Sequence, residues 1–162
     1  MSSAKKTTSY SVDSSALIHA WRRSYPPKNF PQFWERLDEL IEAGRLYSSS
    51  EVLKELKKKD DELYGWCKTR SGIFLPITEA IQDNVVEIMG AYPRLVDTTK
   101  GRSSADPFVV AIARAADPER VVLSEENPGS TTSPKIPDVC KAEGVRCLRV
   151  VELIQEEGWI FR

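Results

Sequence analysis

Separate segments of the chain carry carboxylates, each close to the end of a predicted strand or within a predicted helix. These residues are Asp13, Glu55, Asp106, Glu125 and Glu126. Carboxylates gathered within a few ångströms repel one another, so such a cluster stays ionised at neutral pH only if a cation neutralises it. Oxygen ligands without histidine or thiolate suit Mg²⁺ or Mn²⁺, whose natural substrate groups are phosphates. The set therefore predicts metal-assisted cleavage of a phosphodiester bond, with the metal activating water and stabilising charge on the phosphorus oxygens.

Two of these acids also have a purely structural interpretation. Asp106 precedes Pro107, which suits the first position of a helix, so Asp106 is also a natural N-cap. Glu55 lies on the flank of a predicted helix, and its alternative role is a surface pair with Lys59 at i+4. Capping and metal binding do not exclude each other, so both acids remain candidate ligands.

Glu125 and Glu126 are adjacent in the sequence and must point to different sides. One of them is expected to be a ligand and the other a solvated side chain. The spacing does not choose between them.

The elements that position these acids alternate between strand and helix. Asp13 ends a strand over 10–13, and a helix is predicted over 15–23. The other predicted strands are "RLYS", "IFLPI", "RVVLS" and "VRCLRV". The other predicted helices lie in "QFWERLDELIEAG", from about 50 with a second turn or helix after Asp60, in "TEAIQDNVVEIMGAY", from "ADPFVVAIARAA", near 137–143 and at about 151–157.

This order is typical of a doubly wound α/β domain with a central, mainly parallel, twisted sheet. The continuous apolar run "VVL" at 121–123 supports a strand that is covered on both faces. Ligands of such sheets bind outside the carboxyl ends of the strands. Asp13 is therefore expected where a functional site would lie.

Composition sets the broader class of the protein. The 162 residues are 41% hydrophobic and 29% charged, which predicts one folded domain over 10–162 preceded by a flexible N-terminal tail over 1–9. No long apolar run is present and the first residues lack a secretory signal, so we expect a cytoplasmic protein without a membrane segment. The three cysteines fit neither a metal pattern nor a disulfide framework, and are expected to be reduced packing residues. With 23 basic against 24 acidic residues, no global basic field indicates nucleic acid, and a polyanion must bind a local patch.

Other phosphate-handling families are excluded by particular residues. A haloacid-dehalogenase-type phosphatase needs a second aspartate two residues after the first, where this chain has Ser15. The acceptor aspartate and the lysine of a response-regulator receiver are absent from "RLYSSS" and "VVLSEE", and no glycine-rich phosphate loop occurs.

Four stretches, taken in order, resemble the motifs of PIN-domain nucleases, including the toxin subunits of VapBC-type toxin–antitoxin pairs. The stretches are "YSVDSSALI", "SSSEVLKEL", "SSADPFVVAIA" and "VVLSEE". "LIHAW" and "KIPDVCKAEGVRC" resemble a bacterial branch of that superfamily that is described as a domain of unknown function. The resemblance covers nearly the whole chain and implies a single PIN-like α/β/α sandwich.

The resemblance assigns Asp13, Glu55, Asp106 and Glu126 to the four acidic positions, with Ser15 and Ser124 at neighbouring hydroxyl or amide positions. It implies Mg²⁺ or Mn²⁺ as cofactor, an RNA substrate, a cognate antitoxin as partner and a tendency to form homodimers. The last acid of the family is commonly an aspartate after a Thr-x pair, whereas this chain has "SEE" at 124–126. This departure leaves the choice between Glu125 and Glu126 open, and it weakens the expectation for one metal position.

Basic residues near the predicted acids are candidate contacts to the phosphodiester backbone. Arg102 is the first choice, followed by Lys100 and Lys54, although charges on helices are usually solvated. The segment 127–138 has the composition of a long loop and leaves the same strand end as Glu126, so we expect it to border the site.

Two functional classes follow from the sequence. The first is a metal-dependent endoribonuclease, the toxin of a toxin–antitoxin pair. The alternative is a catalytically silent PIN-like module that binds RNA or protein. Four converging carboxylates favour the enzyme, because a scaffold would not need them. Cleavage of DNA would use the same chemistry, and the sequence does not separate it from cleavage of RNA.

Overall fold

Five short parallel strands form the centre of the fold in the computed structural model, which describes residues 7–96 and 104–162. The strands are β1 (Tyr10–Val12), β2 (Leu46–Ser49), β3 (Phe74–Leu75), β4 (Val121–Leu123) and β5 (Cys147–Leu148). Their order in the sheet is β3-β2-β1-β4-β5, so the chain proceeds outward from β1 to β3 and then returns to the other side of β1. The α/β class and the parallel sheet predicted from the sequence are confirmed.

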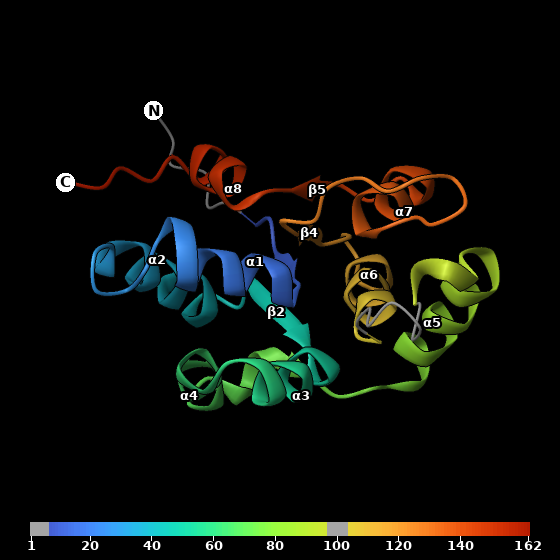
Figure 1. Ribbon diagram of the computed structural model, residues 1–162, viewed down its shortest axis with the longest axis horizontal. Coiled ribbons are helices and arrows are strands. Elements are labelled where there is room, and N and C mark those ends of the chain that lie inside the picture. The colour runs from blue at the N-terminus through green and yellow to red at the C-terminus, as the bar shows by residue number, and fades with distance from the viewer. Residues whose placement is uncertain (1–6, 97–103) are drawn as a thin grey trace.

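Helices cover both faces of this sheet. They are α1 (Ser14–His19), α2 (Pro31–Glu42), α3 (Ser50–Lys59), α4 (Asp61–Lys68), α5 (Glu79–Ala91), α6 (Asp106–Ala115), α7 (Ile136–Glu143) and α8 (Val150–Glu157). A π-helix (Ala20–Ser24) and two 3₁₀ turns (Ser71–Ile73 and Pro93–Leu95) complete the described elements. Figure 1 shows α1 and α2 on one side of the sheet and α6, backed by α5, on the other.

Burial explains why the inner strands are so apolar. Both β1 and β4 are buried along their whole length, as strands covered on both faces must be. The one polar residue of β1, Ser11, donates its hydroxyl to the carbonyl of Val109 in α6 at 2.8 Å. Buried polar groups need such partners, and this bond also connects the sheet to α6.

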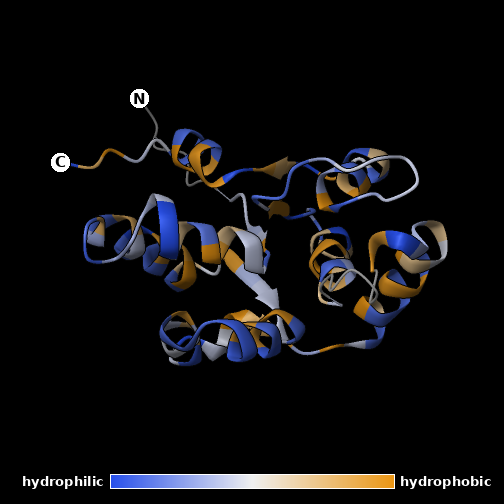
Figure 2. Ribbon diagram, viewed as in Figure 1, coloured by the Kyte–Doolittle hydropathy of each residue, from blue (hydrophilic) through white to orange (hydrophobic). Residues whose placement is uncertain are grey.

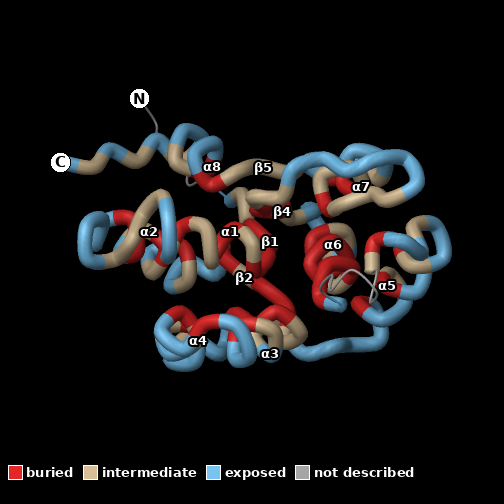
Figure 3. Tube along the Cα trace, in the orientation of Figure 1, coloured by how far each residue is buried: buried red, intermediate tan, exposed pale blue. Residues whose placement is uncertain are grey.

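The helices turn one apolar side towards the sheet and a polar side outward, as Figure 2 shows. Helix α6 is the exception, because the run from Val109 to Ala113 is fully buried between the sheet, α5 and α7. In Figure 3, α6 and the inner strands form the most buried part of the molecule. Within the described residues, no helix is both long and apolar enough to cross a membrane.

The helix predicted over 15–23 has the right extent but not a single type. Its second half is a π-helix, in which the N–H of Tyr25 donates to the carbonyl of Ala20 at 2.8 Å. This wider turn brings the Ser24 hydroxyl within 2.7 Å of His19 Nε2. π-Bulges of this kind are frequent at functional sites.

Asp60 divides the helical segment after residue 50, as the sequence suggested. Its extended backbone ends α3, and its side chain accepts the N–H of Leu63 at 3.2 Å, which caps α4. Its carboxylate also binds Arg22 through two contacts of 2.6 and 2.7 Å. The Arg22 guanidinium holds the pKa of Asp60 below its usual range.

Chain segments at both ends of the described residues are held to the fold by hydrogen bonds. Before β1, the carbonyl of Thr8 accepts Arg45 Nε at 2.6 Å, and the carbonyl of Ser9 accepts the N–H of Val121 at 2.9 Å. At the carboxyl end, Gln32 and Arg162 exchange two bonds of 3.0 Å. Residues 1–6 of the predicted tail lie outside the described residues.

Candidate active site

The carboxyl ends of β1 and β4 lie side by side where the strand order reverses. The two strands pair in register, with Val12 opposite Leu123, so Asp13 and Ser124 follow at equivalent positions. The N–H of Asp13 donates to the carbonyl of Leu123 at 3.0 Å and prolongs the pairing. Ligands of open α/β sheets bind at this kind of switch point.

Asp13 is a buried carboxylate that receives hydrogen bonds from three donors. Ser15 Oγ lies 2.8 Å from each carboxylate oxygen, Ser124 Oγ donates to Oδ2 at 2.6 Å, and the N–H of Ala16 donates to Oδ1 at 2.8 Å. The last bond makes Asp13 the N-cap of α1. The two serines named from the resemblance are therefore direct partners of Asp13.

Burial raises the pKa of Asp13 from 3.8 to about 7. The hydrogen bonds from Ser124, Ala16 and Ser15 oppose this increase, and the negative charge of Glu126 adds to it. Without a counter-charge, Asp13 is therefore about half protonated at neutral pH. A cation at this position would favour the ionised form.

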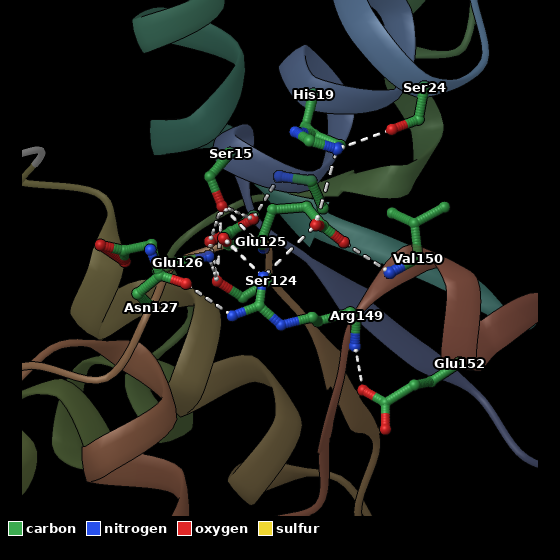
Figure 4. A network of polar contacts seen from close by, with 12 residues as sticks. Ser15, His19, Ser24, Ser124, Glu125, Glu126, Asn127, Arg149, Val150 and Glu152 are labelled. Carbon is green, nitrogen blue, oxygen red and sulfur yellow. Dashed lines mark hydrogen bonds and ion pairs between the residues drawn. The ribbon is translucent and has the colours of Figure 1, made fainter.

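The two adjacent glutamates have different surroundings (Figure 4). Glu125 Oε2 accepts the N–H of Val150, the first residue of α8, at 2.7 Å. Its Oε1 lies 3.6 Å from Arg149 Nη1 and 3.8 Å from His19 Nε2. The Glu125 carboxylate is therefore anchored at the start of α8.

Glu126 has its backbone N–H 3.2 Å from Ser124 Oγ, and its charge acts on Asp13. Because Glu125 is held at α8 while Glu126 acts on Asp13, the geometry favours Glu126 as the ligand candidate of the pair. The sequence spacing had left this choice open.

The other two acids of the predicted set, Glu55 and Asp106, lie in α3 and at the start of α6. Glu55 Oε1 accepts the hydroxyl of Ser14 and lies 3.7 Å from Lys59 Nζ, so the i+4 pair considered from the sequence is present. The prediction that Asp106 caps α6 is wrong by one residue. The N-cap is Ala105, and Asp106 is the first helical residue, where its buried carboxylate lies at the positive end of the helix dipole.

The acidic side chains of the site form a small donor set for a metal ion. Among the residues that the structure describes, no group of three or more His, Cys, Asp or Glu side chains is arranged to hold one. Asp13 and Glu126 nevertheless offer hard oxygen ligands, with the Ser124 hydroxyl beside them. Mg²⁺ commonly binds one or two carboxylates and completes its shell with water and substrate phosphate, so this pair fits Mg²⁺ or Mn²⁺.

The basic residues chosen from the sequence are only partly described. Lys100 and Arg102 lie outside the described residues. Lys54 is exposed on α3 and forms a pair with Glu51 at 3.0 Å. The structure places two other cations, Lys141 and Arg149, beside Ser124 and Glu126. The sequence did contain a signal for Arg149, because it is the second-last residue of the stretch "VRCLRV" predicted as a strand and so was expected near the carboxyl end of that strand.

The long loop after β4 begins beside the site, as its departure from the Glu126 strand end suggested. Pro128 lines the same cavity as Glu126. The loop is pinned further along by Asp138, whose Oδ2 accepts the N–H of Gly129 at 2.6 Å and that of Lys135 at 2.8 Å. These bonds fix the path of the loop at the rim of the site.

Comparisons with known proteins bear on the family and the fold. A family model described as a domain of unknown function (DUF4411) matches residues 10–161. The chain resembles the crystal structure of FitAcB from Neisseria gonorrhoeae, with a TM-score of 0.50 and 17% identity over 86% of this chain and 96% of that chain. It also resembles PAE2754 from Pyrobaculum aerophilum, with a TM-score of 0.45 and 13% identity over 93% and 97% of the two chains. No curated protein matches the chain.

Proposed function

Since the chain belongs to the DUF4411 family and has a PIN-like α/β/α sandwich fold, we propose that it is a metal-dependent endoribonuclease that hydrolyses RNA phosphodiester bonds. The observation that carries the proposal is the buried Asp13, beside Glu126, at the switch point of a parallel sheet. Burying a carboxylate and placing a second negative charge near it is unfavourable unless a cation compensates. Perturbed carboxylates in such a position are common at catalytic sites.

In this proposal the acidic residues bind the metal ion, and the two serines position the Asp13 carboxylate. Asp13 and Glu126 would hold Mg²⁺ or Mn²⁺, with Asp106 and Glu55 as the remaining members of the proposed acidic set. The bound ion would supply an activated water and stabilise charge on the phosphorus oxygens. Ser15 and Ser124 hold the Asp13 carboxylate in one orientation, because each donates a hydroxyl to it.

The biological role that we propose is that of a VapC-like toxin, restrained by a cognate antitoxin in the cytoplasm and able to form homodimers. Its support is the ordered set of motifs that resemble the toxin subunits of VapBC-type pairs. A likeness of fold at 17% identity does not carry activity, so this role is tested separately from the chemistry.

A catalytically silent module that binds RNA or protein is the second candidate. One observation favours it: the Asp13 carboxylate caps α1 and receives three hydrogen bonds, so it has a structural role without any metal. A cap would serve a scaffold equally well.

Cleavage of labelled RNA and single-stranded DNA, with Mg²⁺, Mn²⁺ or EDTA, separates these candidates. We expect the wild-type protein to cut RNA only with metal, and Asp13→Asn and Glu126→Gln each to lower the rate at least about a hundredfold, because both remove a charge aimed at the reacting centre. Glu35→Gln is the matched control, since Glu35 is an exposed residue of α2 that lies beside the carboxyl-terminal segment and does not line the cavity at Glu126. If the protein cuts DNA and not RNA, the enzyme is a deoxyribonuclease and the proposed RNA substrate is wrong. No cutting and no Mn²⁺ binding by calorimetry would support the silent module.

A further inference from the structure

A cavity of about 260 Å³ opens beside the carboxylates, between α7 and the β5–α8 segment. We propose that this cavity is the subsite that holds one unpaired nucleotide of the RNA next to the scissile phosphate. The inference rests on the proposed nuclease function and adds the place at which the nucleotide beside the cleaved bond is held, together with the residues that hold it. Of the basic residues predicted from the sequence, Lys54 is described, and it lies on α3 and not among the lining residues of this cavity.

The cavity is continuous with the candidate site. Ser124 and Glu126 belong to its lining, and Ser124 Oγ is the atom that donates to Asp13 at 2.6 Å. Its other walls follow the carboxyl end of β5 and the loop that leaves β4. A group bound in the cavity would therefore lie next to the atoms at which cleavage is proposed.

Two basic side chains supply contacts for phosphate. Lys141 is an exposed residue of α7, and no hydrogen bond or ion pair joins its ammonium to another described residue. Arg149 is held more firmly, because its guanidinium donates to Asn127 Oδ1 at 2.8 Å and to the carbonyl of Glu125 at 3.3 Å (Figure 4). An arginine has five N–H donors, so this anchoring leaves others for a ligand.

The carboxylate of Glu152 also lines the cavity. Its Oε1 accepts the backbone N–H of Arg149 at 2.9 Å and so closes the first turn of α8. The two acids of the lining thus have other partners: Glu126 is assigned to the metal in the proposed function, and Glu152 accepts the N–H of Arg149. Both are therefore compatible with a phosphate bound near Lys141. Lys141 comes from α7, whereas Glu152 comes from α8, so the two residues belong to different walls of the cavity.

The remaining lining is mainly apolar and suits the face of a base. It consists of Pro128, Pro137, Val145, Cys147 and Leu148. Sequence-specific recognition of RNA mostly uses unpaired bases, which can leave the stack and enter a pocket, whereas a duplex keeps its bases inside and offers mainly shape and backbone. A cavity of this size, with Lys141 and Arg149 in its lining, therefore fits a single unpaired nucleotide.

The test compares Lys141→Ala with Lys68→Ala, which removes the same charge from an exposed site at the end of α4, far from α7 in Figure 1. Cleavage kinetics are measured on single-stranded RNA at several salt concentrations. We expect Lys141→Ala to raise KM roughly fivefold to tenfold with kcat nearly unchanged, as for a lost phosphate contact. The magnitude of the logarithmic salt slope should also fall by about 1, and Lys141→Arg should restore most of the affinity.

Binding measured without cleavage separates this inference from the proposed function. Fluorescence anisotropy of the Asp13→Asn protein is recorded with a labelled single strand and with the same sequence as a duplex. We expect the single strand to bind more tightly, and Lys141→Ala in this background to remove that preference. Cutting by the wild-type protein with identical KM for Lys141→Ala and Lys68→Ala overturns the subsite and leaves the nuclease intact. Absence of cutting, with binding that still depends on Lys141, overturns the nuclease and keeps the cavity as an RNA site. Absence of any RNA binding overturns both.

Discussion

At the scale of single residues, the site depends on one carboxylate whose environment opposes its charge. Asp13 is 2% exposed, and its pKa is raised to about 7 because burial disfavours the ionised form more than its hydrogen bonds favour it. An enzyme can tolerate such a group because a ligand compensates it during function. Removing this carboxylate should therefore raise the free energy of unfolding of the metal-free protein and lower the rate of cleavage.

Replacing Asp13 with Asn should stabilise the metal-free protein above pH 7 while abolishing cleavage. The folded pKa of about 7 lies above the ordinary value of 3.8, so the native state binds the proton more tightly than the unfolded state. The wild-type free energy of unfolding should then fall as pH rises from about 4 to about 7, by at most about 1.4 kcal/mol per pH unit for one proton.

Chemical denaturation in EDTA across this pH range measures both effects. The asparagine variant, which does not titrate here, should lack that slope. Addition of Mg²⁺ should stabilise the wild-type protein at pH 7.5 and leave the variant unchanged. Equal pH profiles for the two proteins would show that Asp13 ionises normally in the folded chain.

Glu125 is expected to position its neighbour and not to bind the metal. Its carboxylate is held at the start of α8, and this contact fixes the segment that carries Glu126. Glu125→Gln keeps an acceptor for the N–H of Val150 but loses the charge that faces Arg149 and His19. We expect kcat to fall about tenfold to a hundredfold, since a displacement of about 1 Å at a reacting group has this effect. Stability should fall by about 1 kcal/mol, because an anion at the start of α8 is lost.

A helix cap far from the site provides the control for this variant. Thr78→Ala removes the side-chain bond to the N–H of Ile81 at the start of α5 and should cost a similar free energy of unfolding, about 1 kcal/mol. Its kcat should equal that of the wild-type protein in the same assay. If both variants lost activity equally, the effect of Glu125 would be one of stability and not of position.

At the scale of elements, the loop between β4 and α7 depends on one glycine. A Cβ added at Gly129 would lie 2.3 Å from the carbonyl oxygen of Ser133, and the backbone cannot accept this contact without moving. The same loop provides Pro128 to the proposed nucleotide cavity. The conformation of the loop should therefore be required for substrate binding more than for folding.

Gly129→Ala should raise KM several-fold and change the free energy of unfolding by about 1 kcal/mol or less, because the loop is exposed and can shift without opening the core. Gly72→Ala is the matched control, since nothing lies within 4 Å of a Cβ at that position. Steady-state kinetics and urea denaturation of both variants measure the two quantities. An unchanged KM for Gly129→Ala would separate the loop from the substrate.

At the scale of the whole molecule, a buried polar cluster connects the amino ends of the sheet to the last helix. Glu157 of α8 accepts the hydroxyl of Tyr10 and pairs with Arg45 at 2.6 Å, with 4% and 15% of the two charged side chains exposed. Burial and the neighbouring carboxylate raise the pKa of Tyr10 above its ordinary value. Three segments that are distant in sequence thus meet through hydrogen-bonded groups that are largely shielded from water.

Glu157→Ala should lower the free energy of unfolding by about 3 kcal/mol, because it leaves the partly buried Arg45 without its carboxylate. The neighbouring Glu156 pairs with Arg146 at the surface, with 31% and 57% of these side chains exposed. Glu156→Ala should therefore cost less than about 1 kcal/mol. Urea denaturation of the two single variants gives the comparison, and similar costs would show that the cluster is weaker than its burial suggests.

The amino-acid sequence by itself determined the class of the fold and the edge of the sheet at which the site lies. Alternating strand and helix patterns require a parallel sheet, and parallel strands collect their carboxyl ends at one edge. This argument places Asp13 at that edge, whereas Ser124 enters the site only through the resemblance to PIN-domain motifs. Local signals also placed the division at Asp60 and the loop after Glu126, since capping and loop composition act over a few residues.

Only the tertiary structure decided which of two adjacent glutamates acts on Asp13. It did so by holding Glu125 against Arg149 and Val150 at the start of α8, which lie 24 and 25 residues further along the chain. Glu125 and Glu126 have the same chemistry, so no local pattern distinguishes them. Likewise, the cavity with Lys141 and Arg149 exists only because α7 and β5 pack next to β4. Spacing along a chain fixes the direction of side chains within one element, whereas the partners of those side chains depend on how distant elements pack together.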